Sequence, residues 1–184
     1  QEREIIFLSD APVVIYEHNW KVDGDWKNWG TCLEMAGIAC PLCDNGIPRY
    51  KAAIFPIISC YEWTDKAGKK HEFEPKVLVC KKSTWEKIER AAKRLEQKGV
   101  SLKYALFLAA RGNDDKSPAA GDDFQYQDHV PADNDKLKGI EIPKIEEIFC
   151  PNPEALKRIA RRLRVEKSED EASPDADTKN VDFT

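Results

Sequence analysis

One stretch decides how this chain folds: Cys32-Leu33-Glu34-Met35-Ala36-Gly37-Ile38-Ala39-Cys40-Pro41-Leu42-Cys43. Cys40 and Cys43 have the spacing that lets both sulfurs of a tight turn face one metal ion. A tetrahedral zinc ion needs two more ligands, and the nearest candidates are Cys32 and His18. The sequence therefore predicts a zinc-binding loop over residues 18–46.

The identity of the fourth ligand stays open at this point. Cys60, Cys80 or Cys150 could replace His18, although Cys60 and Cys80 lie in apolar segments that are typical of core packing. The other interpretation of the whole stretch is that its cysteines are only small buried side chains. We favour metal binding because a polar, glycine-containing loop has no core for them to fill. Four protein ligands leave no position for a substrate, so such a site is structural rather than catalytic.

Short segments rich in branched and aromatic residues alternate with turn residues along most of the chain. Strands are expected over residues 4–8, 12–17, 50–55, 57–63, 75–80, 102–110 and 122–127, with turns at 23–25, 65–70 and 112–118. Pro56 cannot donate a ladder hydrogen bond and marks an edge or a bulge. The clearest helix is predicted over 83–98, where a capping box begins at Ser83 and Gly99 follows the last turn.

Several short strands, with one helix before the last hairpin, follow the element order of a small Greek-key barrel of the OB type. We therefore predict a mainly β fold with inserted helices (α+β), an OB-like Greek-key barrel with a zinc-binding loop. A split antiparallel sheet with a packed helix would give a similar pattern. The expected parts are an OB-like domain over 1–130 that includes the zinc loop, a linker over 131–151 with a short amphipathic segment, a basic amphipathic helix over 152–165 and a disordered acidic tail over 166–184.

The net charge of −4 conceals an uneven distribution. Residues 165–184 hold seven acidic and two basic side chains, so the rest of the chain is close to neutral. Any basic face must therefore come from local clustering. The tail ends in Asn180-Val181-Asp182-Phe183-Thr184, which places an apolar pair at the tip of an anionic segment. We expect this tip to recruit partner proteins.

Composition and motifs also exclude several classes of protein. No apolar run is long enough to span a bilayer and no signal peptide is visible, so no membrane association is expected. Six cysteines would permit three disulfides, but secreted disulfide scaffolds are shorter and contain less lysine. We expect a cytosolic protein with reduced cysteines. It has no phosphate-binding glycine loop, nucleophile elbow or His-Glu-x-x-His motif, and we do not expect an enzyme.

Aromatic and cationic side chains lie close together in several segments. Unpaired strands of nucleic acid bind when bases stack on aromatic rings, at about 1–3 kcal/mol per base, while cations follow the phosphates. About half of such rings are ordinary core residues. The residues predicted to contact nucleic acid are Trp20, Trp26, Lys27, Trp29, Arg49, Tyr50, Lys51, Tyr61, Trp63, Lys81, Lys82 and Arg111.

Five motifs occur in a fixed order between residues 3 and 163. They are Tyr16-Glu17-His18, Thr31-Cys32, Cys40-Pro41-Leu42-Cys43, Thr64-Asp65-Lys66-Ala67-Gly68-Lys69 and Gly-Asn-Asp-Asp-Lys-Ser-Pro-Ala-Ala-Gly-Asp-Asp-Phe at 112–124. This order resembles a family of tailed-phage single-stranded-DNA-binding proteins, distantly related to the zinc-containing helix-destabilising proteins of T4-like phages. The resemblance implies an OB-like fold and a structural zinc held by His18, Cys32, Cys40 and Cys43.

The same resemblance implies a function. It implies sequence-tolerant binding of single-stranded DNA during phage replication and recombination, in the cytoplasm of the infected host cell. It also implies that the acidic C-terminus contacts replication and recombination proteins. The alternative hypothesis is a zinc-braced adaptor that acts on a polymerase or other replication or transcription machinery. A nuclease or other metal enzyme is a third class, which a zinc site closed by four protein ligands disfavours.

Overall fold

The computed structural model describes residues 2–22, 25–110, 123–150 and 152–171, with the side chains of 22, 25–28 and 164–171 excepted. The chain divides into two compact units. Unit 1 consists of Gln1–Glu17 and Tyr50–Cys150, and unit 2 of His18–Arg49 and Pro151–Thr184. Among the described residues, no helix has the length and apolar character needed to cross a membrane.

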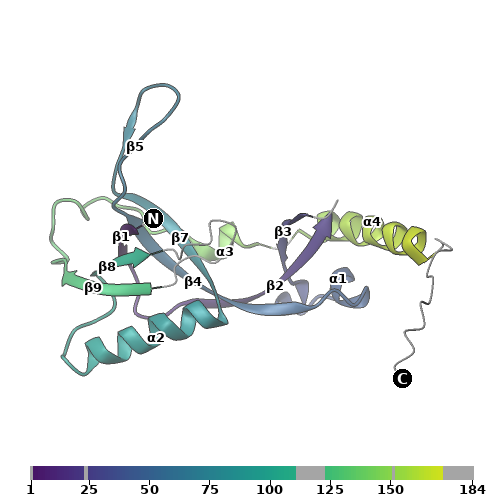
Figure 1. Cartoon of the computed structure of the whole chain (residues 1–184), viewed down its shortest axis with the longest axis horizontal. Coiled ribbons are helices and arrows are strands. Elements are labelled where there is room, and N and C mark those ends of the chain that lie inside the picture. Colours follow the sequence, from purple (N-terminus) through teal and green to yellow (C-terminus); the bar gives the residue numbers. More distant parts are fainter. Residues whose placement is uncertain (1, 23–24, 111–122, 151, 172–184) are drawn as a thin grey trace, which may run out of the picture. The chain divides into compact units, whose positions relative to one another are not determined.

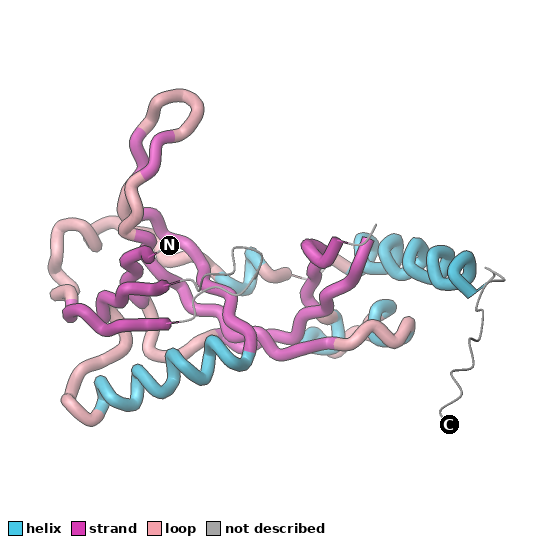
Figure 2. Tube along the Cα trace, viewed as in Figure 1, coloured by secondary structure: helices cyan, strands magenta, loops and turns pink. Residues whose placement is uncertain are grey.

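Strands dominate the described part of the chain (Figures 1 and 2). They are β1 (Glu2–Phe7), β2 (Val13–Val22), β3 (Asp25–Thr31), β4 (Arg49–Ser59), β5 (Trp63–Thr64), β6 (Lys70–His71), β7 (Glu74–Lys81), β8 (Ala105–Ala110) and β9 (Asp123–His129). The helices are the short 3-10 helix η1 (Leu33–Ala36), α1 (Pro41–Asp44), α2 (Lys82–Glu96), α3 (Ile145–Ile148) and α4 (Pro153–Glu171). The predicted mainly β fold with inserted helices is confirmed.

Most of the strands form one sheet in the order β3-β2-β4-β1-β8-β9, with β7 also paired to β4. The β1–β4, β1–β8, β4–β7 and β8–β9 pairs are all antiparallel. Among the described residues no ladder joins β7 to β9, so the sheet is open and the closed barrel of the prediction is not seen. The last pair of the β1–β4 ladder is Phe7 with Ile57, and Pro56 is the next residue along β4. Its missing N–H therefore interrupts none of the described β1–β4 pairs.

Strand β4 is the centre of unit 1 because both of its faces are buried from Ala52 to Ser59. One face, with Phe55 and Ile57, packs with Phe7 and α2, and the Phe7 and Phe55 rings meet edge-on at 5.3 Å. The opposite face, with Ala52 and Ile54, packs with α3 and the residue after it. The side chains of a strand alternate between its two faces, so this single strand connects both layers of the core.

The helix boundaries differ from the sequence prediction in two places. Helix α2 begins at Lys82 with no side-chain cap, and Thr84 is buried, so the predicted capping box does not form. Gly99 does follow the helix at a φ of 72°, as the stop signal predicts. Helix α4 continues to Glu171 rather than ending at 165, because its acidic residues are good helix formers even though they are anionic.

The units also divide the chain differently from the predicted domains. The short helix in the predicted linker, α3, packs into the core of unit 1 through Ile145. The basic helix α4 belongs with the zinc loop in unit 2 rather than forming a separate element. Three predicted features lie wholly or partly outside the described residues, because residues 23–24, 111–122 and 172–184 are not described. They are the turn at 23–25, the loop at 112–118 and most of the tail.

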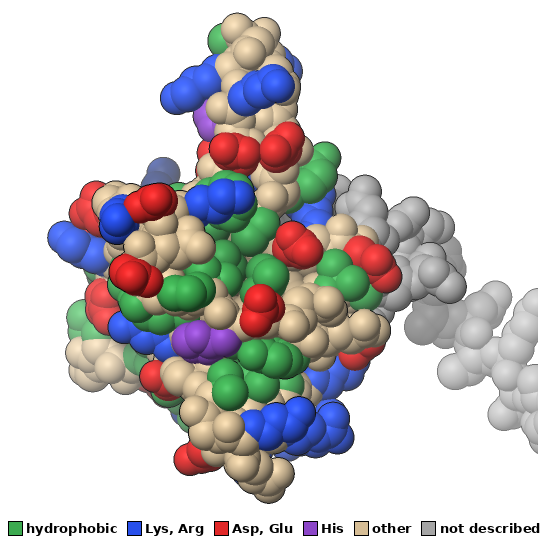
Figure 3. Space-filling view, turned by 90° about the vertical axis from the view of Figure 1, so that its left-hand side faces the viewer, with side chains coloured by type: hydrophobic (Ala, Val, Ile, Leu, Met, Phe, Trp, Pro, Cys, Tyr) green, Lys and Arg blue, Asp and Glu red, His purple; other side chains and the backbone are tan. Residues whose placement is uncertain are grey.

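Strands β5 and β6 form a separate two-stranded sheet, called the β5–β6 hairpin here, with Trp63 opposite His71. The hairpin projects from unit 1 (Figures 1 and 3). Two-stranded hairpins are marginal on their own. Side chains supply the missing order: the Trp63 and His71 rings stack at 4.3 Å and 13°, and the His71 ring nitrogens lie 3.1 Å from Asp65 Oδ2 and 2.7 Å from Glu74 Oε1.

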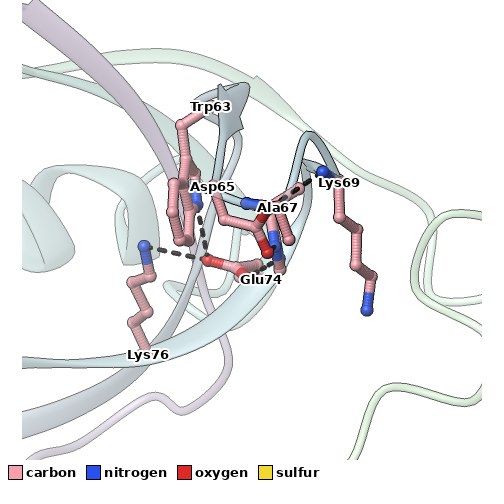
Figure 4. A network of polar contacts seen from close by, with 7 residues as sticks. Trp63, Asp65, Ala67, Lys69, Glu74 and Lys76 are labelled. Carbon is pink, nitrogen blue, oxygen red and sulfur yellow. Dashed lines mark hydrogen bonds and ion pairs between the residues drawn. The ribbon is translucent and has the colours of Figure 1, made fainter.

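Further hydrogen bonds extend this network into the turn and toward the body of unit 1 (Figure 4). Asp65 Oδ1 accepts the backbone N–H groups of Ala67 and Lys69, both at 2.9 Å. Glu74 Oε2 accepts the Trp63 indole N–H at 3.0 Å and pairs with Lys76 at 3.1 Å. These contacts hold the pKa of both carboxyl groups below the usual values, that of Asp65 chiefly through His71 and that of Glu74 chiefly through Trp63.

A depressed carboxyl pKa makes the order of the hairpin dependent on pH. The contribution is fully present above the unfolded values, near pH 4, and is lost as the pH falls through the lower folded values. We expect the amide proton shifts of Ala67 and Lys69 to titrate with a midpoint below 3.8, because Asp65 accepts both bonds. An NMR titration checks this, with Asp65→Asn as the control that should show no such step. A midpoint at or above 4 would contradict the network.

Candidate metal centre

The four predicted ligands of the metal come from three neighbouring segments of unit 2. His18 lies on β2, Cys32 directly precedes η1, Cys40 directly precedes α1 and Cys43 lies inside α1. Pro41 occupies the first position of α1, where its fixed φ suits a helix and its missing N–H breaks no hydrogen bond. The helical turn therefore begins at Pro41, one residue after the first cysteine of the pair.

Backbone hydrogen bonds lock this turn in place. The carbonyl of Cys40 accepts the N–H of Asp44 at 3.0 Å, and that of Cys43 accepts the N–H of Gly46 at 2.9 Å. Gly46 has a φ of 69°, a left-handed conformation that glycine adopts without strain. Leu42, between the two cysteines, is fully buried and anchors the turn. Both thiols are thereby held on the same side.

Three of the separations between the donor atoms match those of a tetrahedral zinc site. His18 Nε2 is 3.5 Å from both Cys40 Sγ and Cys43 Sγ, and Cys32 Sγ is 3.6 Å from Cys43 Sγ. All four atoms lie within 4.8 Å of one another. Tetrahedral zinc with its ordinary bond lengths places two sulfurs about 3.8 Å apart and a sulfur and a nitrogen about 3.6 Å apart. All four cysteine and histidine side chains can therefore bind one metal ion, and the cysteines are free thiols rather than disulfides.

The histidine is oriented by a contact on its far side. The His18 Nδ1–H donates to the carbonyl of Ile47 at 3.0 Å, which directs Nε2 toward the sulfurs. The ring is fully buried, and burial lowers the pKa of His18. The neutral imidazole, which is the form that binds metals, is therefore favoured.

The sulfurs repel one another as thiolates in the absence of a cation. Burial, followed by contacts with Cys32 and Glu34, raises the pKa of Cys43. Burial would also raise the pKa of Cys40, but backbone N–H groups, first that of Cys43, lower it overall. Neighbouring thiols whose pKa values shift in opposite directions do not all lose their protons. A divalent metal ion would remove this conflict because all its thiol ligands bind as thiolates.

A charged pair lies against the cluster. The guanidinium of Arg49 donates to Cys32 Sγ at 3.9 Å and forms an ion pair with Glu34. These two partners, Cys32 first, raise the pKa of Arg49. Arg49 is one of the residues predicted to contact nucleic acid, and the structure places it beside the Cys32 sulfur of the cluster.

Helix α4 packs on the same loop within unit 2. The Asn45 side chain donates to the carbonyl of Ala160 at 3.0 Å. Leu156 packs against Gly30, where an added Cβ would lie 3.3 Å from both Leu156 and Trp20. Trp20 is only 7% exposed, so this predicted nucleic-acid contact is a core residue with no ring face open to a base. The basic helix thus buries Leu156, Ala160 and Leu163, whereas Arg158, Arg161 and Arg162 are exposed.

The remaining cysteines lie in unit 1 and not in this cluster. Cys80 is part of the core beneath α2, Cys60 packs beside Ile58, and Cys150 is exposed. Of the candidates for the fourth ligand, His18 is therefore the one that the structure brings to the three cysteines.

The structure separates the predicted nucleic-acid contacts into groups. Three of them, Tyr50, Lys51 and Lys81, lie in unit 1 near Tyr16, and we call these four residues the tyrosine–lysine group. Because Tyr50 and Lys51 are consecutive on β4, the group consists of two ring–cation pairs on opposite faces of the sheet. Lys81 Nζ lies 5.2 Å from the Tyr50 ring centroid, and Lys51 Nζ lies 5.7 Å from that of Tyr16. Neighbouring β4 and β7 carry Tyr50, Lys51 and Lys81 at adjoining ends, with Ala52 opposite Lys81.

Sequence reasoning missed two members of this region. Tyr16 belongs to a quoted motif but was not among the predicted contacts. Glu17 is 2% exposed, accepts the Tyr50 hydroxyl at 2.9 Å through Oε2, and leaves its other oxygen without a hydrogen-bond partner among the described residues. Burial raises the pKa of Glu17. The sequence feature that could have identified Tyr16 and Glu17 is the two-residue period of the strand, which places these neighbours on opposite faces.

The other predicted contacts are dispersed. Trp29 is 54% exposed in unit 2, and Tyr61 is 47% exposed in unit 1 beneath Arg3. Trp63 is 38% exposed but is stacked within the β5–β6 hairpin. Lys82 pairs with Glu86 at 3.8 Å. The side chains of Trp26 and Lys27, and all of Arg111, lie outside the described residues.

No protein-family model matches this chain, and a search of curated proteins returned no match. The metal centre and the tyrosine–lysine group therefore carry the functional argument on their own geometry.

Replacing one thiol should empty the metal centre. We expect wild-type protein to bind about one zinc ion per chain and Cys40→Ser to lose most of it, with a melting temperature lower by roughly 5 °C or more, because metal binding supplies folding free energy. Elemental analysis and thermal denaturation measure both effects. Cys150→Ser, at an exposed cysteine outside the cluster, is the matched control. Equal zinc content in the two variants would refute the site.

The ion pair beside Cys32 should tune the affinity for metal. Arg49→Ala is expected to weaken zinc binding by about tenfold, the size of effect typical of residues that contact a metal-binding side chain. Competition with a chromogenic chelator measures this, with Arg94→Ala on the exposed side of α2 as the control. An Arg49→Ala affinity equal to that of the control would show that the guanidinium does not act on the sulfur.

Proposed function

We propose that this protein binds single-stranded DNA without regard to sequence and has no catalytic role. It coats and protects unpaired strands during phage replication and recombination, in the cytoplasm of the infected cell. The family resemblance of its motifs first suggested this function, and two features of the described residues support it.

The tyrosine–lysine group is the observation that carries the proposal. It consists of two pairs of a half-buried aromatic ring and an exposed ammonium group, Tyr50 with Lys81 and Tyr16 with Lys51, on opposite faces of the sheet near the start of β4. The rings offer π faces for bases of any kind, and the lysines are point charges suited to phosphates. Glu17 holds the Tyr50 hydroxyl from below, so this ring is positioned before any ligand arrives. Positioned rings lose less conformational entropy on binding.

The metal centre also supports the proposed function, because a bound ion would brace the loop that carries its ligands. We propose that the ion is zinc, because three thiols and one imidazole at tetrahedral separations suit that metal. With four protein ligands the ion would have no open position for a substrate, so its role is to order residues 18–49. Among the described side chains of residues 18–49, the buried apolar ones other than cysteine are Trp20, Leu33 and Leu42, so without the ion this segment has little core of its own.

An OB-like arrangement belongs to this proposal as well. Strands β1 to β7 precede α2 and the paired strands β8 and β9 follow it, so that one helix precedes the last strand pair, as in OB-folds. OB-folds are partly open barrels, and closure would bring β7 and β9 together. The acidic C-terminal residues would contact replication and recombination proteins, as the resemblance implies.

One observation favours the adaptor as a second candidate. The metal loop exposes apolar side chains, with Met35 46% and Ile38 48% exposed. Apolar side chains on a rigid loop suit a protein interface better than a phosphate backbone. Under this alternative the zinc unit contacts a polymerase or other replication or transcription machinery, and unpaired DNA is not bound.

Removing charge from the tyrosine–lysine group should weaken binding of unpaired DNA. We expect Lys51→Ala/Lys81→Ala to reduce the affinity for oligo-dT by about fivefold or more at low salt, and to lower the slope of log affinity against log salt by about 1.4. Fluorescence anisotropy of labelled oligo-dT measures both quantities. The control is Lys93→Ala/Lys98→Ala, which removes equal charge from exposed sites at and just beyond the end of α2.

The same titration separates the two candidate functions. Wild-type protein that binds no oligo-dT at low salt, with zinc present, is the result expected of the adaptor. Binding that is unchanged in 1 M salt would also refute the DNA-binding proposal, since phosphate contacts are lost as salt rises.

A further inference from the structure

The β5–β6 hairpin holds a cluster of cations that the structure does not use. Lys66, Lys69 and Lys70 lie within five residues and are all exposed. None of their ammonium groups is paired with a described carboxylate. Figure 3 shows basic side chains near the free end of the hairpin and acidic side chains at its base.

The one acidic side chain of the turn is directed inward. The Asp65 carboxylate is taken up by the N–H groups of Ala67 and Lys69 and by the ring of His71. It thus orders the turn and forms no ion pair with the three lysines, since each of its oxygens already has another partner. The result is a turn of fixed shape with positive charge on its outer side.

The aromatic ring of the hairpin has a structural role. One face of Trp63 is stacked on His71, Lys76 lies 5.9 Å from its ring centroid, and its N–H is bonded to Glu74. Little of this ring remains for a base, although the sequence predicted stacking there. What the hairpin presents to a ligand is therefore charge.

The flank of the hairpin is less suitable for phosphate than its tip. A groove of about 590 Å³ runs beside the strands and is lined by Glu62, Trp63, Thr64, Lys70, His71 and Glu72. Two exposed carboxylates in that lining would repel a phosphate chain. The tip has no such exposed acid, so an anionic ligand is favoured there.

We propose that the β5–β6 hairpin is a pre-ordered arm that grips the phosphate backbone of a bound single strand through Lys66, Lys69 and Lys70. This inference rests on the proposed function, because it names a second contact on the same ligand. The hydrogen bonds of Asp65 fix the backbone from which the three lysines extend before binding, so the entropy lost on contact is smaller than for a flexible loop. The arm adds affinity without sequence preference, because phosphates are common to every nucleotide.

The test compares three proteins in oligo-dT titrations at several salt concentrations. They are the wild type, the tip variant Lys66→Ala/Lys69→Ala/Lys70→Ala, and a control variant Lys93→Ala/Arg94→Ala/Lys98→Ala with equal charge removed from exposed positions at and after the end of α2. We expect the tip variant to bind about tenfold or more weakly at low salt, with a salt slope lower by about 2, and the control to change little. Melting temperatures within about 2 °C of wild type show that both variants are folded.

The outcomes separate this inference from the proposed function. If wild-type protein binds oligo-dT and the tip and control variants behave alike, the arm is refuted while DNA binding stands. If wild-type protein does not bind, the proposed function itself fails. Asp65→Ala keeps all three lysines and removes the bonds that order the turn, so it should weaken binding several-fold. Wild-type affinity in that variant would refute the pre-ordered arm.

Discussion

The mutual approach of one imidazole nitrogen and three sulfurs is the constraint on which unit 2 depends. His18 Nε2 lies 3.5 Å from the sulfurs of Cys40 and Cys43. The sulfurs of Cys32 and Cys43 are 3.6 Å apart, a distance at which two thiolates would repel one another strongly without a cation. The loop that carries them has Leu33 and Leu42 as its buried apolar anchors, which is little for a segment of this length. Metal binding would therefore supply much of the free energy that orders the loop.

Unit 1 is stabilised in a different way. Strand β4 is buried on both faces, and the Phe7, Phe55 and Phe107 rings meet edge-on beneath α2. This apolar core needs no metal. It provides a rigid support for polar groups at its margins, where the buried Glu17 holds Tyr50 and a network of carboxylates holds the β5–β6 hairpin. Positioned rings and cations on a rigid support are what a sequence-tolerant binder of unpaired strands requires.

Several features could be predicted because they depend on neighbours in sequence. The Cys40–Cys43 pair, the proline that begins α1 and the glycine that ends α2 are local signals, and each occurs where its chemistry requires. Trp20 shows the limit of such reasoning. A tryptophan beside a lysine suggests a stacking surface, yet its ring is buried because Gly30 and Leu156, distant in sequence, close over it.

The sequence by itself determined the type of fold and the turn that brings Cys40 and Cys43 together, since these follow from residue type and short spacing. The tertiary structure alone decided that His18 completes the cluster rather than Cys60, Cys80 or Cys150, that Arg49 lies against a ligand sulfur, and that the sheet stays open between β7 and β9. Each of these depends on which segments meet in space. Such meetings are set by the packing of the whole chain, and local patterns do not encode them.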